Sequence, residues 1–453
     1  MNVAAVNDAP VIMLTNATTK NSSRTFTEVS GSSNTQTAAV GFLADGWAGA
    51  NALSDIDNTS LNNIIIRFKS DQMTGGDRIL IGPVLTTTSA QSAIDLTTSS
   101  STSGTFSQGV NSWKWTLSSV SNGSYDREVK FENALSGATS QTLSAFQALL
   151  ETLKYNNNSD TPSGSPRNFG VFANDGSSTT STSSEATFTV TVVPTNDAPV
   201  IRLNGVDTGT YTATYTEGSG SQVAGDKVSF TSSAANCLTD ADNTSLTSLT
   251  VSIQKTQVVS GDRLWSGTTP IDLNAAADSF GTVTAGQTTF KWTITDAMEG
   301  GINKRKVTFI NNVGSTASTD DFKALLASLQ FDSTSDAPGT IREFTVQASD
   351  GSTANGTSNS ALFTVTVVPT NDAPVIKLDG STTNPRTVNF TEGDSPCAFI
   401  AAAAAGFLTD SDGATSLMNG LTISIARAQV GVGDSLTMAP AGASNPLIID
   451  LNS

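Results

Sequence analysis

The sequence predicts an all-β protein made of tandem cadherin/Ig-like β-sandwich domains, and three observations support this fold class. Apolar and polar residues alternate with period two, most plainly in ATFTVTVV at 186–193 and ALFTVTVV at 361–368, as strands with one buried face do. Val, Ile, Thr and Phe dominate such runs, and Gly, Asn, Asp and Ser interrupt them at short intervals, which is typical of an antiparallel sandwich. The third observation is a repeat: VVPTNDAPVI at 192–201 returns at 367–376, and VNDAPVI occurs at 6–12.

Several other motifs keep the same phase, which defines a repeat of about 180 residues. They are Thr-Glu at 27, 216 and 391, then LSDIDNTSL, LTDADNTSL and LTDSDGATSL from 53, 238 and 408, then GGDRIL, SGDRLW and VGDSLT from 75, 260 and 432. We expect a linker at 1–7, repeat one at 8–195, repeat two at 196–370 and a partial repeat three at 371–453. A third copy without its last strands would expose edges, so we expect a fragment of a longer array or a copy completed by another chain.

One short helix is expected in each repeat, before the last strands. The pattern at i, i+3, i+4 and i+7 predicts that one face packs against the sandwich. The apolar residues are Phe146, Leu149, Leu150 and Leu153 in repeat one and Phe322, Leu325, Leu326 and Leu329 in repeat two. The expected N-cap residues are Ser144 in the first helix and Ser318, Thr319 or Asp320 in the second.

Composition excludes several functions. The 453 residues include 40 Asp and Glu against 23 Lys and Arg, and such an acidic chain is a poor partner for nucleic acid. It has no His and only two Cys, which leaves little equipment for acid–base, nucleophilic or zinc chemistry, so we expect no enzyme. The longest apolar stretch, at 397–408, is too short to span a bilayer, and no signal peptide is visible.

The order of Thr-Glu, Asp-x-Asp, Ala-x-Asp-Gly, a Val/Thr strand and Asn-Asp-x-Pro resembles cadherin-type repeats. More closely, it resembles the bacterial cadherin-like tandem repeats of large extracellular and surface adhesins. The resemblance covers the whole chain and implies an extracellular or cell-surface segment of bacterial origin. It also implies Ca²⁺ clamped at each junction between repeats, held by the linker, a Glu of the preceding repeat and Asp residues of the following one.

The resemblance assigns three sets of calcium ligands. The first set is Glu28, Asn196, Asp197, Asp240, Asp242 and Asp350. The second is Glu217, Asn371, Asp372, Asp410 and Asp412, and the amino end offers a half site of Asn7, Asp8, Asp55, Asp57 and Asp175. Carboxylate and amide oxygens are the ligands that calcium takes, although these motifs could also form β-turns and solvated loops. The further acidic motif of cadherins has a possible echo in Asp126-Arg127-Glu128.

These motifs lead to an extracellular structural and adhesive array as the expected function, binding other copies of itself, neighbouring repeats, or cell-surface protein or glycan. The alternative is a self-assembling subunit of an extracellular filament, sheath or surface layer. A carbohydrate-binding module is a lesser alternative, because we expect the tryptophans to belong to the core and not to a sugar-stacking platform. These tryptophans are Trp113, Trp115, Trp265 and Trp292. We expect the Gly-Asp motifs to form structural turns.

Overall fold

The computed structural model describes residues 6–16, 20–29, 39–47, 52–81, 92–121, 123–135, 138–220, 222–380, 385–393, 395–400, 407–410, 412, 419–438 and 447–452. Most of the expected leading linker, residues 1–5, lies outside them. The chain divides into two compact units. The first is Met1–Val200 with Thr239–Leu246 and Ala348–Asn359, and the second is Ile201–Leu238 with Thr247–Gln347 and Ser360–Ser453. The repeat boundaries at 196 and 371 stay predictions.

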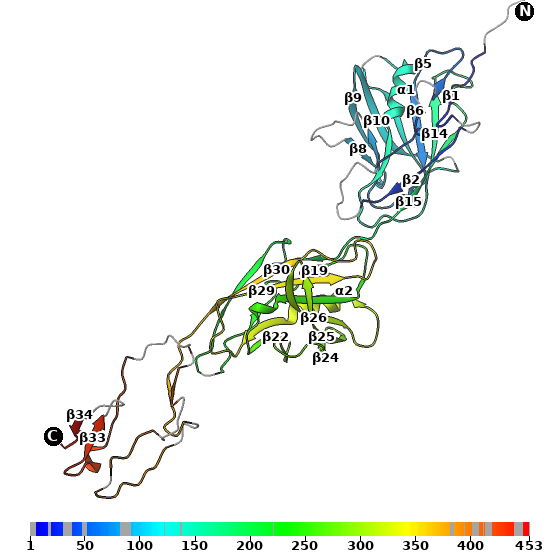
Figure 1. Cartoon of the computed structure of the whole chain (residues 1–453). Helices are drawn as coiled ribbons and strands as arrows, with labels where there is room; N and C mark the ends of the chain where they lie inside the picture. The colour runs from blue at the N-terminus through cyan, green and yellow to red at the C-terminus, as the bar shows by residue number, and fades with distance from the viewer. Residues whose placement is uncertain are drawn as a thin grey trace, which may run out of the picture. The chain divides into compact units, whose positions relative to one another are not determined.

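Repeat one contains a seven-stranded and a four-stranded sheet. The large sheet has the order β2 (Ser22–Thr27), β15 (Ala186–Val193), β14 (Arg167–Asn174), β6 (Asn63–Phe68), β11 (Arg127–Asn133), β10 (Asn111–Ser119) and β9 (Thr102–Gln108). The small sheet has the order β3 (Val40–Gly41), β13 (Lys154–Asn157), β7 (Asp77–Ile81) and β8 (Ser92–Asp95). Several of their strands, from β2 to β15, are labelled in Figure 1. Two short ladders join β1 (Val11–Ile12) to β4 (Leu53–Ser54) and β12 (Gln141–Thr142) to β5 (Ser60–Leu61).

Repeat two has the same topology, which confirms the internal repeat at the level of structure. Its large sheet has the order β17 (Tyr211–Thr216), β30 (Ala361–Val368), β29 (Ile341–Ser349), β21 (Ser248–Gln254), β26 (Ile302–Asn311), β25 (Thr288–Glu299) and β24 (Phe280–Ala285). Its small sheet has the order β18 (Val228–Ser229), β28 (Leu329–Ser333), β22 (Asp262–Ser266) and β23 (Thr269–Asp272). The short ladders pair β16 (Val200–Ile201) with β19 (Leu238–Thr239) and β20 (Ser245–Leu246) with β27 (Ala317–Ser318).

The described part of repeat three contains two short ladders, β31 (Val375–Ile376) with β32 (Leu408–Thr409) and β33 (Ser435–Met438) with β34 (Leu447–Asp450). Its segment LTISI at 421–425 matches LTVSI in β21. Leu249 and Val251 are buried in repeat two, whereas Leu421 and Ile423 are 68% and 49% exposed. The core of the described third repeat is therefore open.

The two sheets of each repeat pack face to face through aromatic side chains. In repeat one the ring of Phe42, just after β3, lies 4.3 Å from Phe188 of β15 and 5.6 Å from Phe169 of β14. Phe230 and Phe363 form the same pair in repeat two, 4.4 Å apart. The all-β sandwich prediction is confirmed. One detail differs from an antiparallel sandwich: β2 with β15, and β17 with β30, pair in parallel, because the first long strand of each repeat runs beside the last in the same direction.

The predicted helices are α1 (Leu143–Thr152) and α2 (Thr319–Ser328). Their apolar faces are buried as expected, and the ring of Trp113 packs on Phe146 of α1 at 4.8 Å. Ser318 is the N-cap of α2, as predicted, but the cap of α1 is Thr142 and not Ser144. Three 3₁₀ turns complete the described elements: η3 (Ser70–Gln72), η4 (Lys255–Gln257) and η5 (Arg427–Gln429). Within the described residues, no helix is both long and apolar enough to cross a membrane.

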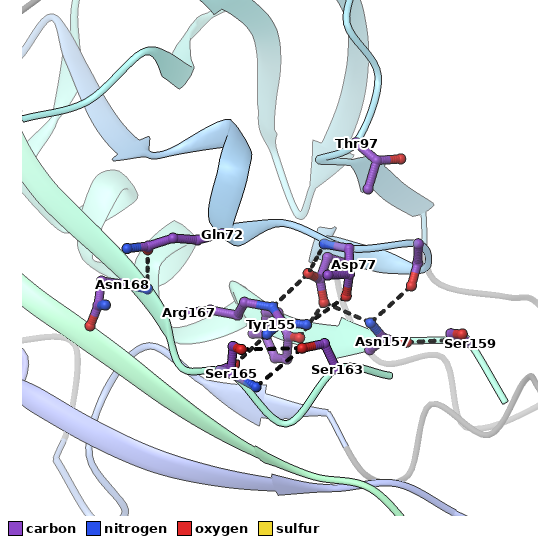
Figure 2. A network of polar contacts seen from close by, with 12 residues as sticks. Gln72, Asp77, Thr97, Tyr155, Asn157, Ser159, Ser163, Ser165, Arg167 and Asn168 are labelled. Carbon is purple, nitrogen blue, oxygen red and sulfur yellow. Dashed lines mark hydrogen bonds and ion pairs between the residues drawn. The ribbon is translucent and has the colours of Figure 1, made fainter. Parts of the chain in front are cut away.

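The recurring Gly-Asp motif anchors a buried ion pair. In Figure 2, Asp77 accepts hydrogen bonds from Arg167 Nε at 2.6 Å, Asn157 Nδ2 at 2.6 Å and the Tyr155 hydroxyl, and both ionic side chains have no exposed surface. Asp262 and Arg342 repeat the pair at 2.6 Å.

The glycine of this motif has a steric role. Gly76 adopts φ +89°, and a Cβ there would meet the Ser159 backbone nitrogen at 2.5 Å. The motif is therefore structural, because the glycine allows a left-handed turn that places Asp77 within ion-pair distance of Arg167.

The four tryptophans flagged by the sequence have different surroundings. Trp113 is fully buried, as expected for core, while the other three are half-buried. Trp115 and Trp292 each cover a glycine on the neighbouring strand, Gly104 and Gly281, where a Cβ would lie 2.7 Å from the indole.

Candidate metal centres

The first predicted ligand set gathers within one compact unit. Glu28 follows β2, Asn196 and Asp197 lie between β15 and β16, and the Asp-x-Asp pair follows β19. Three hydrogen bonds tie these loops together: Asn196 Nδ2 donates to Asp350 Oδ2 at 2.9 Å, the Asp197 N–H to Asp242 Oδ2 at 3.2 Å, and the Thr195 N–H to Glu28 Oε2 at 2.8 Å. All six predicted residues belong to the first unit.

Burial and mutual repulsion perturb the carboxylates of this first site. Burial raises the pKa of Asp240 to about 6, and Asp242 and Asp350 add to the rise against the opposing hydrogen bond from the Asn243 N–H. Burial likewise raises the pKa of Glu28, whose neighbours include Asp197. These neighbouring charges are all carboxylates, so the site concentrates negative charge that a cation would neutralise.

The second set repeats these contacts within the other unit. Glu217 Oε2 accepts from the Thr370 N–H at 2.9 Å, the Asp372 N–H donates to Asp412 Oδ2 at 2.8 Å, and the Asp412 N–H donates to Asp410 Oδ1 at 3.2 Å. Burial raises the pKa of Glu217, and Asp372 and Asp412 raise it further. Asn371 Nδ2 donates to the Asp372 carbonyl at 2.8 Å.

The amino-terminal half site has the same internal arrangement. Asn7 Nδ2 donates to Asp175 Oδ2 at 2.9 Å, and the Asp8 N–H donates to Asp57 Oδ2 at 3.0 Å. Burial raises the pKa of Asp55, whereas the hydrogen bond from the Asp8 N–H lowers the pKa of Asp57. The Asn7–Asp175 contact corresponds to Asn196–Asp350, and the Asp8–Asp57 contact to Asp197–Asp242.

Five carboxylate oxygens are buried without a hydrogen-bond partner among the described residues, and all five belong to predicted ligands. They are Glu28 Oε1, Asp55 Oδ2, Glu217 Oε1, Asp240 Oδ2 and Asp372 Oδ2. A buried anionic oxygen without a partner is unfavourable and calls for an ion or water. The residues present therefore fit calcium in donor type, in charge and in unsatisfied oxygens.

The described side chains do not yet form a ligating cage. Among the described residues, no three Asp, Glu or Cys side chains stand close enough together to hold a metal ion. Hydrogen bonds already engage some of the atoms that would bind the metal. Asn196 directs its Nδ2 toward Asp350, and its Oδ1 accepts hydrogen bonds from Asn243 Nδ2 and Ser352 Oγ, both at 2.8 Å. Binding a cation would require these side chains to turn their oxygens toward one point.

The structure adds residues that the sequence analysis did not assign. Asn58 Nδ2 donates to Asn7 Oδ1 at 3.0 Å, as Asn243 does to Asn196. The sequence contained a signal for these two residues, since Asn58 and Asn243 each follow the Asp-x-Asp pair in LSDIDNTSL and LTDADNTSL. Repeat three has Gly413 at the same position.

Two more acidic residues act on the sites from the loop before the penultimate strand. The charge of Asp160 raises the pKa of Glu28, and that of Asp336 raises the pKa of Glu217. They share the in-phase motif Ser-Asp-x-Pro at 159–162 and 335–338, which the sequence analysis overlooked.

The Asp126-Arg127-Glu128 segment makes other contacts. Asp126 accepts from Ser70, through the N–H and the hydroxyl, both at 2.7 Å. Arg127 donates to the Ser99 carbonyl, and Glu128 pairs with Arg67 at 3.1 Å across β11 and β6. These partners hold the strand β11 in its sheet.

Comparisons with known proteins give distant structural likenesses. No family model matches the sequence, and no curated protein matches it significantly. The chain is similar to a mutant of CfaE, the CFA/I adhesin of enterotoxigenic Escherichia coli, at 10% identity over 77% of this chain and 98% of that one, with a TM-score of 0.20. A second CfaE structure, described as the adhesive subunit of CFA/I fimbria, matches at 9% identity over the same shares, with a TM-score of 0.19.

Cadherin-like domains 1 to 4 of zebrafish RET match at 13% identity over 61% of this chain and 45% of that one, with a TM-score of 0.13. All three scores are low, so the β-sandwich assignment rests on the chain's own sheets.

Proposed function

We propose that this chain is a segment of an extracellular array of β-sandwich repeats that extends and presents an adhesive surface, with calcium rigidifying the connections between repeats. The supporting observation compares two independently chosen sets of residues: the ligands predicted from the sequence, and the residues with buried carboxylate oxygens that lack a hydrogen-bond partner. Among the described residues, every buried carboxylate oxygen without a hydrogen-bond partner belongs to a residue chosen from the in-phase motifs, namely Glu28, Asp55, Glu217, Asp240 and Asp372. Ordinary turn aspartates are solvated, and their oxygens are satisfied by water or by nearby N–H groups.

At the first site, hydrogen bonds hold one carboxylate oxygen of Glu28 and of Asp240 and leave the other oxygen for a cation. Glu28 is held by the Thr195 N–H, so one of its oxygens is fixed and the other is available. Asp240 accepts the Asn243 N–H at 3.0 Å through Oδ1 and leaves Oδ2 without a partner. A bound calcium ion would supply the positive charge that these carboxylates lack, and extracellular modules of this kind bind it with Kd on the order of 10⁻⁴–10⁻³ M.

A thermal unfolding series tests this function. The chain is unfolded in EDTA and across a calcium titration to a few millimolar, beside an Asp240→Ala, Asp242→Ala double variant. A calcium-dependent rise in Tm that the double variant reduces would support the calcium role. An unchanged Tm across the titration would overturn it, and the acidic motifs would then be turns between sandwiches.

The second candidate is a subunit that assembles into a filament, sheath or surface layer. The exposed apolar side chains of the third repeat favour it, because Leu421, Ile423 and Ile425 would gain by burial against strands of another copy. Multi-angle light scattering and electron microscopy of the purified chain separate the two functions. Monomeric particles support the adhesive array, and ordered polymers support assembly.

A further inference from the structure

A polar cavity of about 440 Å³ lies beside the edge strands β2 and β3 of repeat one. Its chemically distinctive lining residues are Arg24, Asp45, Trp47, Glu151 and Lys154. Their positions lie on different elements: Arg24 on β2, Glu151 near the end of α1 and Lys154 on β13. None of these residues belongs to the acidic sites described above.

Hydrogen bonds hold the two largest lining side chains in place. Arg24 donates to both carboxylate oxygens of Asp45, at 2.8 and 2.9 Å, and to the Leu43 carbonyl at 2.8 Å. The indole N–H of Trp47 donates to the Met13 carbonyl at 3.1 Å. The guanidinium and the indole are thus ordered before any ligand arrives, which lowers the entropy lost on binding.

Three of these charged residues have no charged counterpart in the second repeat, which has the same topology. Strands β2 and β17 pair with β15 and β30 in the same register, and α1 and β13 correspond to α2 and β28. The second repeat has uncharged residues at the matching positions: Ala213 for Arg24, Ala327 for Glu151 and Gln330 for Lys154. The charged cavity is therefore a specialisation of repeat one.

We propose that this cavity binds one neutral saccharide unit of a surface glycan. A pyranose ring presents an apolar C–H face that can pack on an indole, and hydroxyl groups that both donate and accept hydrogen bonds. The lining offers the cationic donor Lys154 and the carboxylate acceptor Glu151 beside the ion pair of Arg24 with Asp45. The opposite charges balance, so an ionic ligand gains little net attraction, while an apolar ligand would desolvate all four groups without compensation.

The size of the cavity agrees with this class of ligand, since small-molecule sites measure roughly 300–1,000 Å³. The inference rests on the proposed adhesive function and names a class of ligand for it. It rests on a different set of residues from the calcium sites and does not require them.

Saccharide titrations of the full chain test the proposal. Glucose, galactose, mannose and N-acetylglucosamine are titrated by calorimetry and by saturation-transfer NMR, with glucuronate and glucosamine as charged comparisons. At least one neutral sugar is expected to bind with Kd on the order of a millimolar. Each titration is run in calcium and in EDTA, and equal affinity in both separates this site from the calcium sites.

Two variants and one control localise the binding. Trp47→Ala is expected to abolish it, and Glu151→Gln, at an exposed position, is expected to weaken it several-fold without affecting the fold. Trp265→Ala is the matched control and should leave sugar binding unchanged. The ring of Trp265 is already covered by Lys227 Nζ, which lies 3.2 Å from the ring centroid. Absence of binding by every neutral sugar, binding of the charged sugars alone, or undiminished binding by Trp47→Ala with Glu151→Gln would overturn the proposal.

Discussion

Replacing Asp240 by Asn should stabilise the chain without calcium and destabilise it, relative to the wild type, with calcium. The Asn side chain keeps an oxygen for the Asn243 N–H, which Asp240 Oδ1 accepts at 3.0 Å. It removes a negative charge that Asp242 and Asp350 repel. The substitution therefore separates the electrostatic penalty of the site in the absence of calcium from the hydrogen bonds that shape its loop.

The penalty follows from the pKa of Asp240, which burial and its acidic neighbours raise from 3.8 to about 6. A shift of about two units corresponds to about 3 kcal/mol for a fully buried group. Asp240 is only partly buried, so solvent screening reduces the figure to about 1 kcal/mol. For a repeat of about 180 residues, the unfolding entropy is about 0.4 kcal/mol/K, and Tm in EDTA should rise by about 2–3 °C.

Calcium should reverse the order of stability. With a Kd of about 0.5 mM, 5 mM calcium stabilises the native state by about 1.4 kcal/mol per ion, or about 4 °C. The wild type should gain this increment and Asp240→Asn should lose most of it. Differential scanning calorimetry measures both, with the exposed Asp226→Asn as a control of equal charge change. A variant that keeps the full calcium increment, or that melts lower than wild type in EDTA, would refute the reasoning.

Two further predictions concern a buried ion pair and pH. Arg167→Met leaves the fully buried Asp77 without its ion-pair partner, and it should lower the free energy of unfolding by about 3–5 kcal/mol in urea titrations. The control is Lys130→Gln, which breaks a partly exposed pair with Glu132 and should lower the free energy of unfolding by less than about 1 kcal/mol. A loss below about 1 kcal/mol for Arg167→Met would contradict this prediction. In EDTA, Tm should rise as the pH falls from 7 to 5. The raised pKa of Asp240 lets the native state bind more protons than the unfolded state between about pH 4 and 6. A Tm that falls over this range would argue against repulsion between the carboxylates of the site.

The sequence was sufficient for the architecture because the relevant signals are local and periodic. Alternation in 186–193 and 361–368 predicted strands β15 and β30, whose residues alternate in burial as expected. The spacing of Phe322, Leu325 and Leu326 predicted the buried face of α2. Helix caps were predicted less well, since Thr142, rather than the expected Ser144, sits at the position where the extended chain enters α1.

The sequence predicted which acidic loops lie near one another, because loops that recur in phase occupy equivalent ends of equivalent sandwiches. Their inner arrangement was not. The role of Asn243 as a bridge from Asn196 to Asp350 depends on which side-chain atoms meet across loops that lie 47 and 107 residues apart in the sequence. The cavity beside Trp47 was also beyond the sequence, because its lining comes from strands and a helix that only the fold assembles.

By itself, the sequence determined the repeat, the all-β class, the position of each helix and the identity of the acidic loops, because periodicity and turn chemistry act over a few residues. Only the tertiary structure decided that β2 runs parallel to β15, that Asp77 pairs with Arg167, and which carboxylate oxygens are buried without partners. These features depend on the register and packing of segments distant in the chain. Burial and neighbouring carboxylates then raise the pKa of Glu28, Glu217 and Asp240, and no local pattern encodes these surroundings.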